Sequence, residues 1–401
     1  MSAKVRLAMI GCGGMAGGHL SGYLDLIRKG YDGVELVATC DLIEERAGSF
    51  AASYKELTGN EPRVFTDYKK MLTEVKPDAV DTALPHFLHH EAAVAVMQAG
   101  AHVMVEKPIG ITVRATKRIA EVSQKTGKIA ATAENIRRCL GPRAMKWAID
   151  ERKIIGDPRY FYAYDVHLGQ PNGESSAMKW RLQRIQSGGW TVIDSGAHFT
   201  DLVRYLFGDV ASVSAHVTRF EHQSFEDLDG TTKEADVEDT WMAILTFESG
   251  LVGYWSCGHG LPGHPMNGVF YYGSAGSIKD AGDIFHGFQR EAEILLRDGS
   301  TTSLSRIKED YLLSLPGDEK ERLFPYGITN GVHIECFDFI EAVRTGGQPE
   351  LPAEEGLKSR AINNAIYEAG ATGQTVTMQD ILDCKIEVAQ SPINERYGLV
   401  S

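Results

Sequence analysis

Asp194 and His198 have the residue types and the spacing needed for proton transfer. They lie in the run G-G-W-T-V-I-D-S-G-A-H-F-T-D, which begins at Gly188. On a helix, residues four positions apart lie on one face. Histidine titrates near neutral pH, so His198 can accept a hydroxyl proton, while Asp194 can hold a hydroxyl and favour the imidazolium. A surface ion pair on a helix is the competing interpretation, and Asp201 is expected to be a solvated or helix-pairing carboxylate.

Lys107 is the second candidate for chemistry. It stands in E-K-P (106–108) at the end of an apolar run, and L-P-H-F-L-H (84–89) closes an earlier run. If both runs are parallel strands, these segments lie at the carboxyl ends, where open α/β sheets bind ligands. The Lys107 ammonium, fixed by the following proline, could then face a substrate oxygen. The alternative is a surface lysine paired with Glu106.

A glycine-rich turn near the start of the chain has a dinucleotide-binding pattern, G-x-G-x-x-A. It directly follows the first apolar run and opens a helical pattern, and its residues are Gly11, Cys12, Gly13, Gly14, Met15 and Ala16. Gly11 allows the tight turn, Gly13 lets a pyrophosphate approach the backbone, and Ala16 permits close packing of helix and strand. The pyrophosphate binds at the positive end of the helix dipole. Glycine-rich turns are common, so the motif alone is weak evidence for dinucleotide binding. The predicted strand before it and the predicted helix after it are the stronger evidence.

Asp41 closes the next apolar run, 35–40. A carboxylate there accepts hydrogen bonds from ribose hydroxyls and repels a 2′-phosphate, which favours NAD over NADP. Asp41 follows Gly11 by more than the usual ~20 residues, so we expect a long first helix and loop. The alternative role for Asp41 is to cap the helix that begins near Glu44. Arg46 could meet a phosphate, but a solvated helix face is its expected place.

The first third of the chain alternates apolar runs with amphipathic stretches. The runs are 5–10, 35–40, 79–84, 102–107 and 128–133. Unbroken β-branched runs that alternate with helices are typical of buried parallel strands joined by crossovers. Residues 1–134 are therefore predicted to form an α/β domain with a doubly wound parallel sheet of the Rossmann type.

From about Asp157 the pattern changes to longer aromatic and β-branched strands. These are RYFYAYDV, VASVSAHV, TWMAILTF, LVGYWSCGH and GVFYYG, and only a short Glu-Ser-Gly link separates the third from the fourth, which indicates a hairpin. Residues 135–401 are predicted to form an α+β domain whose mainly antiparallel sheet packs one face on helices. We expect a solvated loop at 221–236, an irregular excursion at 299–330 and helices in the tail.

Composition excludes several classes of protein. The 401 residues are 43% hydrophobic and 24% charged, which predicts a globular protein of two or three domains. A net charge of −13 argues against nucleic-acid binding. No apolar run approaches the ~18 residues of a membrane span, and the start does not resemble a signal peptide. The six cysteines are scattered without a C-x-x-C pair, which fits reduced thiols and a cytoplasmic location.

Taken together, these motifs resemble the Gfo/Idh/MocA family of nucleotide-dependent sugar and polyol oxidoreductases over nearly the whole chain. The matching segments are GCGGMA, PHFLH, AGAHVMVEKP, WRL followed by GGWTVIDSGAHFTD, VEDTW, GSAGSI and EGLKSRAINNAIYEA. E-K-P and D-x-x-x-H in this order are specific as a pair. The resemblance implies a Rossmann domain followed by a large open-faced mixed sheet, with the substrate between the two domains.

The resemblance also implies roles for individual residues. Lys107 and His198 would be the catalytic pair, Asp194 would orient the substrate, and Arg138 is a further candidate for substrate binding. Besides the glycine-rich turn and Asp41, the candidate cofactor-binding residues are Leu84, Pro85, His89, Glu106, Lys107, Asn135, Trp180 and Arg181. Glu134, Asn135, Arg137 and Arg138 follow the last Rossmann strand and either reach the site or form an ordinary polar loop.

The reaction expected from this resemblance oxidises a secondary alcohol of a sugar, glycoside or inositol-type polyol. His198 removes the hydroxyl proton, Lys107 stabilises the developing alkoxide, and hydride passes to NAD. No basic cluster indicates a phosphorylated substrate. The alternative is an enzyme that retains NAD and uses transient oxidation to drive elimination of a glycosidic group. A non-catalytic sensor would be expected to lack Lys107 or His198. The open sheet face predicts a homo-oligomer.

His86, His89 and His90 lie close enough in the sequence to suggest a metal site. Acidic partners are lacking nearby, and the family that the chain resembles uses no metal, so no metal is predicted. His89 matches a family position near the cofactor, and His90 is expected to be structural.

Overall fold

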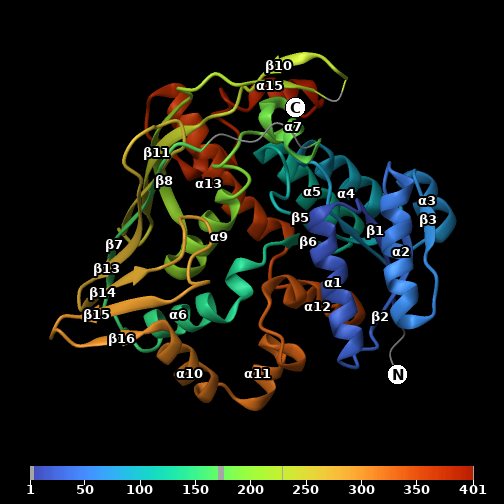
Figure 1. Ribbon diagram of the computed structural model, residues 1–401, viewed down its shortest axis with the longest axis horizontal. Helices are drawn as coiled ribbons and strands as arrows, with labels where there is room; N and C mark the ends of the chain where they lie inside the picture. The colour runs from blue at the N-terminus through green and yellow to red at the C-terminus, as the bar shows by residue number, and fades with distance from the viewer. Residues whose placement is uncertain (1–3, 170–175, 228, 401) are drawn as a thin grey trace. The chain divides into compact units, whose positions relative to one another are not determined.

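The computed structural model describes residues 4–169, 176–227 and 229–400, and the chain divides into two compact units (Figure 1). The first unit comprises Met1–Ile111, Ala115–Arg138 and Gly317–Leu357, and the second comprises Thr112–Arg114, Cys139–Pro316 and Lys358–Ser401. Among the described residues, we find no helix with the length and apolar character that a membrane crossing requires.

The first unit contains a six-stranded parallel sheet in the order β3-β2-β1-β4-β5-β6. Its strands are β1 (Val5–Ile10), β2 (Val34–Cys40), β3 (Arg63–Phe65), β4 (Ala79–Thr82), β5 (His102–Glu106) and β6 (Ala130–Ala133). The crossover helices are α1 (Gly14–Arg28), α2 (Glu44–Thr58), α3 (Tyr68–Val75), α4 (His89–Gln98) and α5 (Val113–Thr126). The predicted doubly wound parallel sheet is confirmed.

Apolar residues on both faces of these strands explain why the sheet is covered on both sides. All four residues of β4 and of β6 are buried. A strand buried on both faces needs helices above and below it, which a right-handed series of crossovers supplies. Helix α12 (Gly331–Thr345), from much later in the chain, packs against α1. At 15 residues, α1 is as long as the spacing between Gly11 and Asp41 predicts.

The second unit contains a nine-stranded sheet in the order β16-β15-β14-β13-β7-β12-β11-β8-β17. Its strands are β7 (Pro158–Val166), β8 (Val210–Thr218), β11 (Thr240–Phe247), β12 (Val252–Gly258), β13 (Met266–Gly273), β14 (Gly276–Asp280), β15 (Ala292–Leu296), β16 (Thr301–Ser303) and β17 (Val376–Thr377). Neighbouring strands are antiparallel except β7 and β12, which run parallel. The predicted hairpin is β11–β12, and the mainly antiparallel sheet is confirmed.

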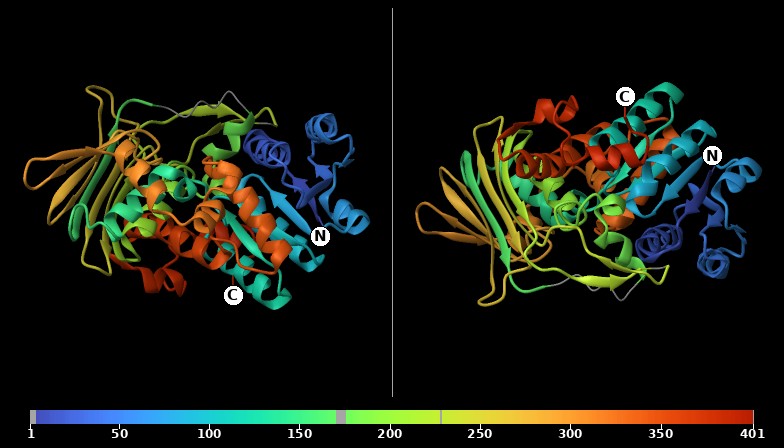
Figure 2. Two further views of the ribbon diagram at one scale, coloured as in Figure 1. Left: turned by 90° about the horizontal axis from the view of Figure 1, so that it is seen from below. Right: turned by 90° about the horizontal axis from the view of Figure 1, so that it is seen from above.

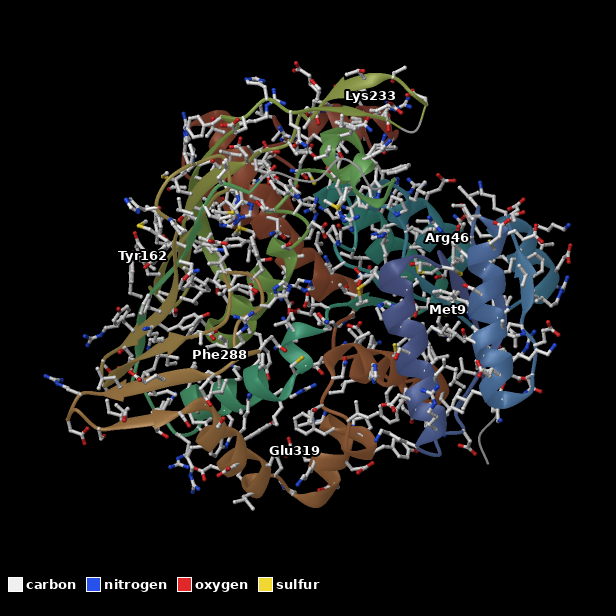
Figure 3. All side chains as sticks on the ribbon, in the orientation of Figure 1. Met9, Arg46, Tyr162, Lys233, Phe288 and Glu319 are labelled. Carbon is white, nitrogen blue, oxygen red and sulfur yellow. The ribbon has the colours of Figure 1, made fainter. Side chains whose placement is uncertain are left out.

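Helices of the second unit cover one face of this sheet (Figure 2). They include α6 (Leu140–Asp150), α9 (Gly196–Phe207) and the part of α13 (Ala353–Thr372) that belongs to this unit. Successive side chains along each strand point to opposite faces of the sheet. On the helix-covered face, Phe161 and Trp255 are buried and contact Phe199 of α9. Tyr162 on the opposite face of β7 remains 37% exposed and points away from these helices (Figure 3).

Two predictions for connecting segments were wrong. Within 221–236, strands β9 (Ser224–Glu226) and β10 (Thr232–Glu234) form a small hairpin, because Phe225 packs in an apolar cluster with Leu182. The segment 299–330 contains β16 and three helices, α10 (Leu304–Ser314), α11 (Gly317–Leu323) and η4 (Pro325–Gly327). In α10, residues 304, 307 and 311 are buried, so the helical spacing was present in the sequence.

Candidate active site

The glycine-rich turn of the first unit has the geometry of an anion cradle. Gly11 has a φ of +86°, and a Cβ there would lie 2.2 Å from the Ala83 carbonyl oxygen, so only glycine fits. A Cβ on Gly13 would meet no atom within 4 Å. Helix α1 begins at Gly14 with no side-chain cap and no acidic residue in its first turn. Its first N–H groups and its dipole therefore suit the pyrophosphate of a dinucleotide.

Asp41 lies beside this turn and organises it. One carboxylate oxygen accepts a hydrogen bond from the Cys12 backbone N–H at 2.8 Å, and the other accepts from the Ile43 N–H at 2.9 Å. Each oxygen keeps a further lone pair that could accept from a ribose hydroxyl. Burial, together with the nearby Asp41 charge, raises the pKa of Cys12 to about 12, so this residue stays a thiol.

His89 lies between the segment that follows β4 and the turn that contains Lys107. Its Nε2 is 2.7 Å from the Leu84 carbonyl oxygen, and its Nδ1 is 2.9 Å from the Pro108 carbonyl oxygen. The ring is fully buried, and burial lowers its pKa. Both distances are within hydrogen-bond range, and the tautomer sets which ring nitrogen donates in the neutral imidazole. Because both ring nitrogens face carbonyl oxygens, His89 links the segment after β4 to the turn that contains Lys107.

Glu106, which precedes Lys107, points into a buried charged network that the sequence did not reveal. His19 of α1 is 2.9 Å from the Asp81 carboxylate, and its other ring nitrogen lies 3.7 Å from Glu106 and 3.6 Å from Glu335. Burial opposes the charge on His19, but Asp81 raises its pKa well above the ordinary value. For Glu335 the effects are reversed: burial raises the pKa of its carboxyl well above the ordinary value, and the His19 charge opposes this rise. The network ties α1 and α12 to the ends of β4 and β5.

In the second unit, Asp194 lies in a turn and not on a helix. Helix α9 begins at Gly196, and the Asp194 N–H bonds the Trp190 carbonyl oxygen at 2.8 Å. The prediction that Asp194 and His198 share one helix face was therefore wrong. Arg181 donates from Nε to the Asp194 carboxylate at 2.7 Å, and its guanidinium lies 4.4 Å from the Trp180 ring centroid. The structure thus brings Trp180, Arg181 and Asp194 together.

Three side chains from later in the chain hold the turn that leads into α9. The buried Glu238 carboxylate accepts hydrogen bonds from the N–H groups of residues 190 and 192, at 3.0 and 3.2 Å. Trp241 donates to the Thr191 hydroxyl at 2.9 Å, and Asn363 donates to the Val192 carbonyl at 2.7 Å. These residues lie in the segments V-E-D-T-W and R-A-I-N-N, which resemble the family, but their spacing along the chain gave no sign of this shared task.

His198 lies in the first turn of α9 and is 9% exposed, with its ring 5.1 Å from that of His286. The loop that carries His286 is anchored by Asp280, whose two oxygens accept from the N–H groups of Gly282 and Phe288 at 2.8 and 2.7 Å. Burial raises the pKa of Asp280 to about 6 despite these hydrogen bonds. No motif surrounds His286 in the sequence, so it was not among the predicted site residues.

Two other acidic or basic residues lie in surroundings that differ from a solvated surface. Asp201 is 2% exposed and accepts a hydrogen bond from Ser359 at 3.0 Å, so the expectation of a solvated carboxylate was wrong. In the first unit, Arg138 is 1% exposed and lies 3.0 Å from Asp338. Glu134, nearby, accepts from the Ile136 N–H at 3.0 Å. The roles assigned to Arg138 and to Asn135 stay predictions.

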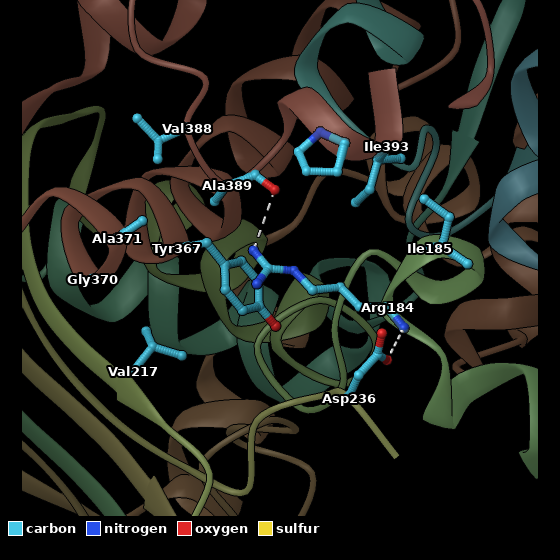
Figure 4. Close-up of a pocket in the computed structure, with 11 residues that line it drawn as sticks. Arg184, Ile185, Val217, Asp236, Tyr367, Gly370, Ala371, Val388, Ala389 and Ile393 are labelled. Carbon is cyan, nitrogen blue, oxygen red and sulfur yellow. Dashed lines mark hydrogen bonds between the residues drawn. The ribbon is translucent and has the colours of Figure 1, made fainter. Parts of the chain in front are cut away.

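A separate pocket of about 360 Å³ in the second unit is lined by none of the predicted site residues (Figure 4). The Arg184 guanidinium lies 5.0 Å from the Tyr367 ring centroid and donates to the Ala389 carbonyl oxygen at 3.3 Å. Most of the remaining lining side chains are small and apolar.

Comparison with known proteins agrees with this architecture. Residues 5–134 match the NAD-binding Rossmann domain of the GFO_IDH_MocA oxidoreductase family, and residues 146–378 match the C-terminal alpha/beta domain of that family. The chain therefore belongs to the Gfo/Idh/MocA family of oxidoreductases, as the sequence motifs suggested.

One curated relative covers most of the chain, and another covers less than half of it. D-apiose dehydrogenase of Paraburkholderia graminis is 26% identical over 383 residues, which is 93% of this chain and 90% of that protein. Glycosyl hydrolase family 109 protein 1 of Akkermansia muciniphila is 34% identical over 169 residues, which covers 41% of this chain and 34% of that protein. Among solved structures, levoglucosan dehydrogenase in complex with NADH and L-sorbose has a TM-score of 0.74 at 21% identity, covering 94% of this chain and 100% of that chain. The structural likeness shows a shared fold.

Proposed function

We propose that this protein is an NAD-dependent dehydrogenase that oxidises a secondary alcohol of a sugar, glycoside or inositol-type polyol. The observation that carries the proposal is the open glycine-rich turn at the uncapped start of α1, in the same unit as a lysine held at the carboxyl end of β5. The names of full-length relatives such as D-apiose dehydrogenase support the substrate class.

In this proposal the chain supplies acid–base groups and the cofactor accepts the hydride. Bound NAD would lie on the glycine-rich turn, with Asp41, Leu84, Pro85 and Asn135 from the first unit and Trp180 and Arg181 from the second as further contacts. His198 accepts the hydroxyl proton, and Lys107 donates a hydrogen bond to the oxygen as negative charge develops there. Asp194, fixed by Arg181, orients a substrate hydroxyl.

We also propose NAD as the preferred nucleotide. Asp41 places a negative charge next to the turn that would hold the pyrophosphate, and a carboxylate repels the extra 2′-phosphate of NADP.

A second candidate is an enzyme that retains NAD and oxidises its substrate transiently, so that a glycosidic group can be eliminated. The relative that favours it is the glycosyl hydrolase family 109 protein, which matches this chain over part of its length. Such an enzyme would release no net NADH.

One experiment separates these candidates. The purified protein is incubated with a panel of free sugars, glycosides and inositols, with NAD and NADP in parallel, and absorbance at the NADH wavelength is followed. A dehydrogenase gives steady NADH production with at least one substrate. Cleavage of a glycoside without NADH accumulation, by protein that already contains NAD, would support the second candidate. Turnover with NADP alone would overturn the role of Asp41.

We further propose that the enzyme acts in the cytoplasm as a homo-oligomer. None of the six cysteines, all of which lie in the described part of the chain, forms a disulfide, as a reducing compartment allows. The helix-free face of the nine-stranded sheet exposes apolar side chains that a second copy could cover.

A further inference from the structure

Two histidines and an aspartate converge at one edge of the nine-stranded sheet, and the proposed reaction uses none of them. Asp165 lies near the end of β7, His167 follows that strand, and His259 follows β12. Since β7 and β12 are parallel neighbours, their carboxyl ends meet at the same edge. One donor atom from each of the three side chains lies within 4.8 Å of the others.

The backbone around this group is held by hydrogen bonds beyond the ends of the two strands. The His167 N–H bonds the Gly258 carbonyl at 2.9 Å, and the Gly169 N–H bonds the His259 carbonyl at 2.9 Å. The His259 N–H in turn bonds the Asp239 carbonyl at 2.8 Å. The backbone positions of Asp165, His167 and His259 are therefore fixed by hydrogen bonds that extend the sheet.

The three side chains point their donor atoms toward a common centre. His167 Nδ1 is 3.1 Å from one Asp165 oxygen, whereas His259 Nε2 is 3.7 Å from the other, too far for a hydrogen bond. Among the residues that the structure describes, this buried His259 nitrogen has no hydrogen-bond partner. The His259 ring packs against Trp190 and the His167 ring, which fixes its orientation. Leaving a buried polar nitrogen without a partner is unfavourable, and a bound cation would remove this cost.

We propose that Asp165, His167 and His259 form a binding site for one divalent transition-metal cation of the Zn²⁺ type. Two imidazoles and one carboxylate suit zinc, cobalt or nickel, whereas magnesium and calcium prefer oxygen ligands. With metal–ligand distances of about 2.0–2.1 Å, ligand atoms in a tetrahedral site lie about 3.3 Å apart. The two histidine nitrogens are already 3.1 and 3.7 Å from the Asp165 oxygens. Metal binding would therefore mainly change the distance between the two imidazole nitrogens.

Three protein ligands leave at least one coordination position for water or a substrate oxygen. Access is available from the His167 side, because its side chain is 42% exposed while that of His259 is 12% exposed. This site lies wholly within the second unit and does not rest on the dehydrogenase proposal.

The test uses the full-length protein after treatment with a chelator. Co²⁺ is titrated into it while the visible absorbance is followed, and the Zn²⁺ content is measured by elemental analysis after dialysis. We expect close to one ion per chain and a visible Co²⁺ spectrum typical of nitrogen and oxygen ligands. His259→Gln should weaken binding by at least tenfold, whereas His264→Gln, an exposed histidine outside the group, should bind as the wild type does.

Circular dichroism and NAD binding confirm that each variant is folded. If His259→Gln does not fold, His167→Gln removes a more exposed ligand and gives the same test. Binding of less than about 0.2 ion per chain, or equal binding by wild type and folded ligand variants, would overturn the proposal. Failure of the dehydrogenase assay would leave the metal content unchanged, so the two proposals fail independently.

Discussion

At the scale of single residues, the segment that carries Lys107 is held by contacts of the residues around it. His89 spans the Leu84 and Pro108 carbonyl oxygens, and Glu106 turns into the network around His19. A lysine with a structural role alone could be truncated at little cost to catalysis. A lysine that stabilises a developing alkoxide could not.

Lys107→Ala should therefore lower kcat by about 10²–10³-fold, the usual cost of removing a donor to a developing oxyanion. NAD affinity, measured by fluorescence titration, should change by less than about threefold, because the glycine-rich turn is untouched. Lys125→Ala, an exposed lysine of α5, is the matched control and should retain full turnover. Wild-type kcat in Lys107→Ala would remove this residue from the mechanism.

Asp41 carries the second prediction at this scale. Its carboxylate accepts from the Cys12 and Ile43 N–H groups, and an asparagine keeps one acceptor oxygen while it removes the charge. Asp41→Asn should raise the ratio of kcat/KM for NADP to that for NAD by about tenfold, equivalent to about 1.4 kcal/mol. Asp32→Asn, an exposed residue before β2, should leave the ratio unchanged. An unchanged ratio in Asp41→Asn would contradict the assigned preference.

At the scale of elements, the periodicity of apolar residues predicted the strands and helices that are set by local sequence. The strands of the first sheet, the β11–β12 hairpin and the long α1 follow from runs of apolar residues. Asp194 was misplaced because a D-x-x-x-H spacing fits a helix and a tight turn equally well. Glu238, which holds that turn, and His286, which contacts His198, act through contacts between distant segments, and a single sequence carries no signal for those.

The loop that carries His286 gives a pH-dependent prediction. Asp280 has an ordinary pKa of 3.8 when unfolded, and burial raises its pKa to about 6 in the folded protein. A carboxyl with a raised pKa stabilises the fold while it is protonated, and this contribution is full below pH 4 and is lost as pH rises through 6. The loss amounts to about 3 kcal/mol for the complete transition.

Asp280→Asn removes the titrating carboxyl group. Its amide oxygen can still accept a hydrogen bond from the N–H group of Gly282 or of Phe288. Urea unfolding of both proteins between pH 4 and 7.5 checks the prediction. The free energy of unfolding should fall more steeply with pH for the wild type than for the variant, and the difference should be confined to this interval. Parallel curves for the two proteins would show that Asp280 is ionised throughout.

At the scale of the whole molecule, the described helices of the second unit cover one face of the nine-stranded sheet and leave the other face open (Figure 2). Along each strand, alternate residues point outward, and several of them are large and apolar: Tyr160, Tyr162, Met242, Ile244 and Tyr272, each 37–47% exposed. Tyr162 also stacks on Tyr254 with ring centroids 4.6 Å apart, so neighbouring strands share one continuous apolar surface. A surface of this kind is typical of contacts between subunits.

Ile244→Glu places a charge in the middle of this face, on β11, where it points away from the core of its own subunit. Light scattering after size exclusion should show a multiple of the 44.0 kDa chain mass for the wild type and a shift toward 44.0 kDa for the variant. Leu313→Glu is the control, because Leu313 is 83% exposed on α10 and lies outside the sheet. A charge buried between subunits costs several kcal/mol, enough to separate them, whereas the same charge in water costs little. An oligomer that survives Ile244→Glu unchanged would place the contact elsewhere on the molecule.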